Sequence, residues 1–141
     1  MEELFAYALL FCEDYDFWDL YSERLDKLFL EYPDNEEYLY LESLTSPKEA
    51  ALHIISAISG MSFDTKLFGR TLMKLIGQAY TKSDLIKFSR RMYSLWNDLP
   101  ASIHHKEPFF TLSYADDCLS YGDKKQCRKL YEQAIHITIE G

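Results

Sequence analysis

The sequence has 141 residues, enough for one domain with a buried core, and its 48% hydrophobic and 16% aromatic content excludes an intrinsically disordered chain. The net charge of −8 is unevenly distributed: residues 1–50 contain fourteen acidic and three basic residues (−11), and residues 51–141 contain nine acidic and twelve basic residues (+3). Generic nucleic-acid binding by the N-terminal third is therefore disfavoured, because it would repel phosphates.

The first predicted element is a short apolar helix over residues 2–12. Its apolar run, residues 4–12, is too short to span a bilayer, so we expect no membrane association. Glu2 and Glu3 precede the run where a secretory signal would carry Lys or Arg. The three cysteines form no C-x-x-C pair, and a disulfide framework is not expected. We expect a cytoplasmic protein.

Residues 14–32 predict an amphipathic helix. Its apolar residues recur with helical spacing and form one stripe: Trp18, Tyr21, Leu25, Leu28, Phe29 and Tyr32. Acidic residues fall on the opposite face: Asp16, Asp19, Glu23 and Asp26. Pro33 is expected to stop this helix, because proline lacks the amide donor.

The next two helices are predicted from their capping residues. Asp34 or Asn35 caps a helix that runs to about Thr45. Ser46, Pro47 and Glu49 are typical of a helix start, and the helix that follows is expected to end at Gly60.

Four more helices complete the predicted chain. A helix opened by Ser62 or Asp64 runs to Tyr80, and Ser83 caps another that closes at Pro100. The linker ASIHHKEP then precedes a helix over 108–121, and Gly122 turns the chain into a last helix over 123–138. We predict an all-α fold of about eight helices in a single domain, residues 1–141.

The last two helices are similar to a tetratricopeptide repeat. In this comparison Ala115 stands at a small position of the first helix, Gly122 and Asp123 at the turn, and Cys127, Tyr131 and Ala134 at the small, aromatic and Ala positions of the second helix. The resemblance implies stacked antiparallel hairpins over residues 2–33, 34–60, 63–100 and 104–138, in a superhelix or a compact bundle. It also implies protein binding without catalysis. The Lys and Asn pattern with which some members clamp a peptide is not visible.

A candidate partner-binding surface lies among the acidic residues. It comprises Asp16, Asp19, Glu23, Asp26, Asp34, Glu36, Glu37 and Glu42. Few basic residues are interleaved, and like charges three or four residues apart destabilise a helix. A basic partner would explain this arrangement, while a solvated helix face is the alternative.

Residues 64–91 are basic. Their cations are Lys66, Arg70, Lys74, Lys82, Lys87, Arg90 and Arg91. A nucleic-acid site there is disfavoured, because Phe68, Tyr80 and Phe88 fall on the predicted buried stripe and are not free to stack on bases.

No residue set predicts catalysis, a cofactor or a metal site. His104 and His105 are adjacent and cannot chelate jointly from a helix, and His53 is expected to be a partly buried side chain. Cys118 and Cys127 are expected in the core of the last hairpin. Gly-rich phosphate loops, GxSxG and HExxH patterns are missing from the sequence.

These observations favour a non-enzymatic, acidic protein-interaction module. In size and charge it is similar to small bacterial immunity or antitoxin proteins, which neutralise secreted toxins, many of them basic nucleases. The expected partner is then a basic protein of that kind. The alternative is a scaffold or regulator, similar to tetratricopeptide proteins, that binds a peptide in a groove between hairpins.

Overall fold

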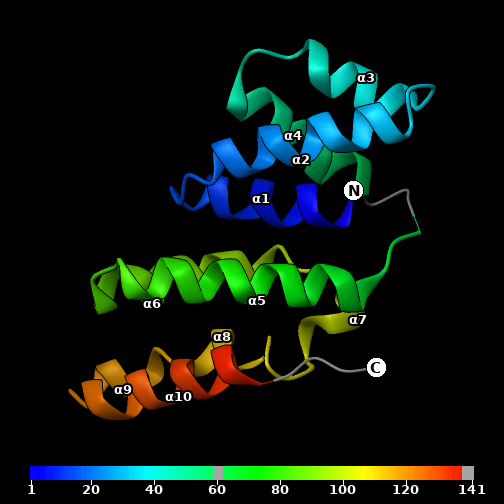
Figure 1. The fold of residues 1–141 in the computed structure, drawn as a ribbon. Coiled ribbons are helices and arrows are strands. Elements are labelled where there is room, and N and C mark those ends of the chain that lie inside the picture. The colour runs from blue at the N-terminus through cyan, green and yellow to red at the C-terminus, as the bar shows by residue number, and fades with distance from the viewer. Residues whose placement is uncertain (59–61, 138–141) are drawn as a thin grey trace. The chain divides into compact units, whose positions relative to one another are not determined.

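The computed structural model describes residues 1–58 and 62–137, and all of its regular secondary structure is helical (Figure 1). The all-α prediction is confirmed. The predicted helix end at Gly60, and the ends of the second and fourth predicted hairpins, lie outside the described residues. No helix in the described ranges is long and apolar enough to cross a membrane.

The chain divides into two compact units, an N-terminal unit of residues 1–68 and a C-terminal unit of residues 69–141. The division also separates the charges. The N-terminal unit has fifteen acidic and four basic residues (−11), and the C-terminal unit has eight acidic and eleven basic residues (+3). The single-domain organisation stays a prediction.

The N-terminal unit is built around one apolar helix. Its helices are α1 (Glu2–Cys12), α2 (Trp18–Glu31), α3 (Glu36–Ser43) and α4 (Pro47–Ile58). Helix α1 packs against both α2 and α4, and α2 packs against α3 (Figure 1). Because α1 is covered from two sides, most of its length is apolar and buried, as in Leu4, Leu9 and Leu10.

Capping residues fix where the helices of this unit begin. Asn35 Oδ1 accepts a hydrogen bond of 3.1 Å from the Tyr38 amide at the start of α3. Ser46 Oγ accepts one of 3.3 Å from the Glu49 amide, with Pro47 as the first residue of α4. Each bond satisfies an amide that has no partner inside its helix. Both predicted helix starts are confirmed.

The C-terminal unit has a core with an aromatic centre. Its helices are most of α5 (Thr65–Thr81, whose first turn lies in the N-terminal unit), α6 (Leu85–Asn97), α7 (Ala101–His104), α8 (Thr111–Tyr114), α9 (Asp117–Ser120) and α10 (Lys124–His136). The Tyr131 ring lies edge-on to Phe88, with 4.9 Å between centroids, and the Tyr80 ring lies 5.2 Å from Phe88. These three rings tie α5, α6 and α10 together.

Three local predictions in this unit are wrong. Asp84, not Ser83, caps α6, because its carboxylate accepts from the Lys87 amide at 3.2 Å, whereas the Ser83 hydroxyl donates to the Ala79 carbonyl. The single helix predicted over 108–121 is divided into α8 and α9. Tight turns interrupt it, such as the 2.9 Å bond from the Leu119 amide to the Asp116 carbonyl. The predicted linker also contains the short helix α7.

The predicted turn at Gly122, between the last two predicted helices, is confirmed. Gly122 has a φ of +77°, and Asp123 caps α10 by accepting from the Gln126 amide. Beyond it Cys127, Tyr131 and Ala134 are buried. The spacing of four and then three residues is thus the inward edge of α10.

Substitution of Gly122 by alanine is expected to lower the free energy of unfolding by about 1 kcal/mol, because a Cβ atom disfavours the left-handed backbone. No atom lies within 4 Å of the position that the Cβ would take, so the cost comes from the backbone alone. Urea denaturation measures it. Gly122→Asn serves as the control and is expected to lose less, because asparagine tolerates this conformation better. Equal midpoints for the wild type and Gly122→Ala would contradict the assignment.

Candidate functional site

The outer face of α2 carries the acidic residues that the sequence predicts. Tyr21, Leu25 and Leu28 point into the unit and are buried. The residues on the opposite side are exposed: Asp19, Glu23, Asp26 and Leu30. Their spacing of four, three and four residues places them on one line along the helix.

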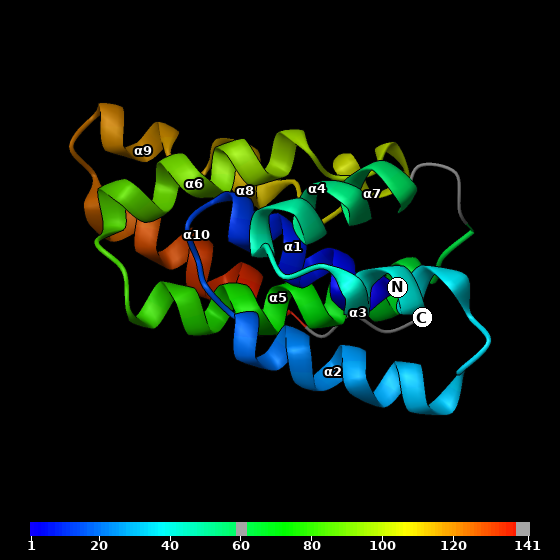
Figure 2. The ribbon, with the colours of Figure 1, turned by 90° about the horizontal axis from the view of Figure 1, so that it is seen from above.

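Helix α3 lies beside α2 and runs in the opposite direction (Figure 2). Two cross-helix contacts define the register. The carboxyl group of Glu42 lies close enough to that of Asp26 for Asp26 to raise its pKa, and the rings of Tyr32 and Tyr38 have centroids 6.3 Å apart. We call seven exposed residues of this layer the α2–α3 surface: Asp19, Glu23, Asp26, Leu30, Glu36, Leu39 and Glu42.

The Asp26–Glu42 pair is the most unusual electrostatic feature of this surface. Although Glu42 is exposed as a whole residue, loss of hydration at its carboxyl group raises its pKa to about 7, and the hydrogen bond and negative charge of Asp26 act in the same direction. Within the described part of the chain, no Lys or Arg forms an ion pair with either residue. Two acidic groups thus share one small region without an internal counter-ion.

The Glu42→Gln variant is expected to be more stable than the wild type at pH 8, by at most about 1 kcal/mol because the site is exposed. The native state holds the Glu42 proton up to about pH 7, whereas the unfolded chain releases it near 4.5. Wild-type stability therefore falls as the pH rises through this window, and the variant removes that part of the fall.

Denaturation midpoints at a series of pH values measure the difference. It should be largest above pH 7 and vanish near 4.5. Glu36→Gln, in the same helix, removes the same charge without touching the pair and is the matched control. If the denaturation midpoints of Glu42→Gln and the wild type differed by the same amount at every pH, the pairing would be contradicted.

Three of the predicted acidic residues, Asp16, Glu23 and Glu37, have partners outside the acidic set. Asp16 accepts a 2.8 Å hydrogen bond from the Trp18 amide, so it helps to start α2. Glu23 forms an exposed ion pair of 3.3 Å with Lys27 in the next turn. Such pairs contribute little and leave the carboxylate accessible.

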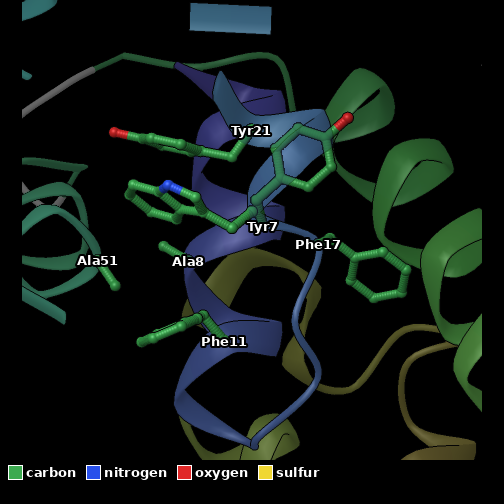
Figure 3. A pocket seen from close by; sticks show the side chains of 7 residues that line it. Tyr7, Ala8, Phe11, Phe17, Tyr21 and Ala51 are labelled. Atoms are coloured by element: carbon green, nitrogen blue, oxygen red, sulfur yellow. The ribbon is translucent and has the colours of Figure 1, made fainter. Parts of the chain in front are cut away.

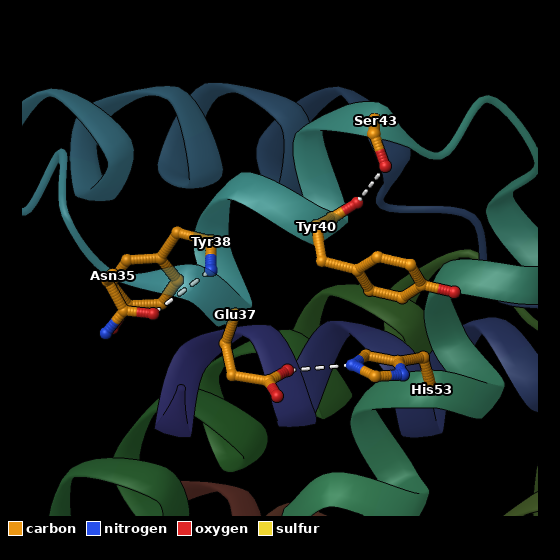
Figure 4. A network of polar contacts seen from close by, with 6 residues as sticks. All are labelled: Asn35, Glu37, Tyr38, Tyr40, Ser43 and His53. Carbon is orange, nitrogen blue, oxygen red and sulfur yellow. Dashed lines mark hydrogen bonds and ion pairs between the residues drawn. The ribbon is translucent and has the colours of Figure 1, made fainter.

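Glu37 is directed away from the α2–α3 surface. Its Oε2 lies 2.7 Å from His53 Nε2 on α4 (Figure 4). The Tyr40 ring lies over the same imidazole, with 4.6 Å between centroids. Asp34 is exposed in the turn between α2 and α3. The structure therefore brings Asp26 and Glu42 together, keeps Asp19 and Glu23 on the same face, and assigns Asp16 and Glu37 to intrachain contacts.

Sequence reasoning missed two features of this region. One is the Tyr40–His53–Glu37 cluster, which depends on how α3 packs on α4 (Figure 4). The other is the exposure of Leu30 and Leu39, of which 78% and 55% of the surface is accessible. The exposure of Leu30 could have been predicted from the sequence. Its helical spacing places it on the face of Asp19, Glu23 and Asp26 and not on the apolar stripe.

The basic residues of 64–91 are mostly exposed. They lie on α5, on α6 and, for Lys82, in the turn between them; Arg70, Lys74, Lys87 and Arg90 are examples on the helices. Phe68 and Phe88 are fully buried, and the Tyr80 hydroxyl donates a 3.1 Å hydrogen bond to Glu132. These rings are therefore occupied within the protein, which is the arrangement that disfavours base stacking.

A groove of about 560 Å³ lies between α5 and α10 in the C-terminal unit. Close helix approach forms its floor, since a Cβ on Gly77 would lie 3.0 Å from Ile135 Cγ2. The lining residues are Lys74, Gly77, Gln78, Tyr80, Thr81, Glu132, Ile135 and His136.

A second, aromatic pocket lies between α1, α2 and α4 in the N-terminal unit (Figure 3). The rings of Trp18 and Tyr21 are stacked there with centroids 4.2 Å apart. The space left is about 10 Å³, room for about one water molecule. Burial raises the pKa of the Tyr21 hydroxyl to about 12, with a smaller contribution from Glu42. This pocket is a packing feature of the core and too small for an organic ligand.

His104 and Cys127 have packing roles. The His104 ring stacks on Trp96 at 3.8 Å, and Trp96 Nε1 donates to the His104 carbonyl. Cys127 is buried with its Sγ 3.7 Å from Ser89 Oγ, and burial raises the pKa of its thiol. Cys118 is half-buried. Among residues 1–58 and 62–137, no three His, Cys, Asp or Glu side chains are grouped so as to hold a metal ion.

Comparison with known proteins gives no match to a protein-family model, a curated sequence or a solved structure. The resemblance of residues 108–138 to a tetratricopeptide unit stays a prediction. Function must accordingly be argued from the surfaces themselves.

Proposed function

We propose that the protein is a non-enzymatic binding module whose α2–α3 surface docks on a basic protein. The observation that carries this proposal is the Asp26–Glu42 pair, in which two carboxyl groups are held against each other without an internal cation. Holding them together costs stability, and a Lys or Arg from a partner would offset that cost. Glu23 and Asp19 extend the same negative surface along α2.

Within this class, an immunity-like role fits the chain best. A basic toxin of the nuclease type binds phosphates with Lys and Arg, and a line of carboxylates on a small protein can occupy the same groove. The charge of −11 in residues 1–68 would speed the encounter by electrostatic steering. The proposal assigns no catalytic step to the chain.

The test measures association with the protein encoded by the neighbouring gene. Asp26→Asn combined with Glu42→Gln is expected to lower the association rate constant by about threefold to tenfold at low salt. Asp16 is left unchanged because it helps to start α2. Asp98→Asn with Asp117→Asn removes two charges from the C-terminal unit and is the control. Equal rates for the two double variants, and a rate insensitive to salt, would refute the proposal.

The second candidate is a scaffold that binds a peptide in the groove between α5 and α10. The volume of about 560 Å³ favours it, because this is the size of a ligand site. Gln78 is exposed at the groove, so Gln78→Trp would fill it without disturbing the core. A groove binder predicts that this variant loses the same partner while the Asp26/Glu42 variant retains it. The acidic-surface proposal predicts the reverse.

A further inference from the structure

Two leucines interrupt the acidic character of the α2–α3 surface. Leu30 is 78% exposed and Leu39 is 55% exposed. A single exposed leucine is ordinary in a folded protein, but adjacent ones on a charged surface are typical of a contact site.

The register of the helices places these leucines side by side. Asp26 lies against Glu42, and in antiparallel helices a step forward on α2 is matched by a step back on α3. Leu30 is one turn after Asp26, and Leu39 is one turn before Glu42. The two leucines are therefore the next pair of facing residues on the same surface, and we call them the leucine pair.

The neighbouring side chains do not cover the leucine pair. Glu37 and Tyr40 are directed toward His53 on α4, on the far side of α3 (Figure 4). Asp34 and Glu36 follow in the turn and first residues of α3, and both are exposed. Carboxylates therefore lie on both sides of the leucine pair. Asp26 and Glu42 are one helical turn away on one side, and Asp34 and Glu36 lie on the other.

From this arrangement we infer that the partner contributes a cationic amphipathic helix, whose apolar side chains rest on Leu30 and Leu39 and whose Lys or Arg residues, one turn away, meet Asp26 and Glu42. The inference rests on the proposed function and specifies its partner. Charge complementarity selects this occupant, because the same surface of a second copy, a nucleic acid or an anionic membrane would each bring negative charge against the carboxylates.

The two kinds of contact should affect different rate constants. The exposed carboxylates act at long range and set how fast the partner arrives, whereas the leucines are desolvated only after docking and set how slowly it leaves. Leu30→Ser with Leu39→Ser is expected to raise the dissociation rate constant by about tenfold or more, with little change in association. Leu52→Ser removes a leucine that is 54% exposed on α4 and is the matched control.

The experiment uses the full chain and three synthetic peptides of equal length. One is a Leu/Lys peptide designed as an amphipathic helix, the second has the same composition in an order without an apolar face, and the third is polylysine. Fluorescence anisotropy should give the tightest binding for the amphipathic peptide, and that preference should be lost in the Leu30/Leu39 variant and kept in Leu52→Ser. Circular dichroism checks that each variant remains helical.

The outcomes separate this inference from the proposed function. Equal binding of the amphipathic and reordered peptides, with a loss only in the Asp26/Glu42 variant, would overturn the inference and leave the basic partner standing. Equal binding by the wild type and both double variants would overturn both.

Discussion

Substitution of Tyr131 by alanine is expected to destabilise the C-terminal unit by about 3–5 kcal/mol, the cost of deleting a large buried aromatic side chain. The Tyr131 side chain has no exposed surface. Its ring contacts Phe88 edge-on at 4.9 Å and lies 6.3 Å from Tyr80, so the deletion removes contacts to two other helices. The cavity left behind has rigid helices on several sides and can collapse only in part.

Urea denaturation followed by far-ultraviolet circular dichroism measures this loss. Gln133→Ala, at an exposed position of the same helix, is the control and should change stability by less than about 0.5 kcal/mol. A Tyr131→Ala variant with the midpoint of the control would mean that α10 is not packed through this ring.

In the N-terminal unit the corresponding prediction concerns Phe5. Phe5→Ala is expected to cost about 3–5 kcal/mol, for the same reason. Its ring, 2% exposed, is stacked on Phe68 with centroids 4.8 Å apart and lies edge-on to Phe63 at 6.1 Å. Beyond area burial, each well-placed aromatic pair contributes about 0.5–1.5 kcal/mol.

Thermal and urea unfolding of Phe5→Ala should both show the loss. Leu52→Ala, at an exposed position on α4, removes a hydrophobic side chain from the surface and should be nearly neutral. Comparable effects of the two substitutions would contradict the central position assigned to α1.

Features encoded within a few residues were predictable from the sequence. The buried stripe of α2 follows from its helical periodicity, and Asn35 and Ser46 were recognisable as caps because the amides that they satisfy lie three residues away. Gly122 was recognisable as a corner for a similar reason, since a left-handed backbone favours glycine.

Short-range competition explains the local errors. Ser83 and Asp84 are both good caps and adjacent, and only the packing of α6 decides which one lies at its first turn. The division of the segment 108–121 has a related origin. Asp is a residue type that favours turns over helix interiors, and the tight turn at Asp116 takes the place of a continuous helix.

Only part of the candidate site could be predicted from the sequence. Asp26 and Glu42 were both identifiable as members of an acidic set, but their pairing depends on the turn between α2 and α3, which sets the register of the two helices. Single-sequence patterns carry no information of this kind, because it arises from tertiary packing.

The central position of α1 has a consequence for how the molecule folds. Helix α1 ends at Cys12 and its main partner α4 begins at Pro47, so the pairing must close a long loop that contains α2 and α3. The entropy of that closure is lost before the apolar contacts are gained, which slows folding. Until α4 has been synthesised, the apolar surface of α1 lacks its main packing partner. A nascent chain halted before Pro47 should therefore depend on chaperones to stay in solution.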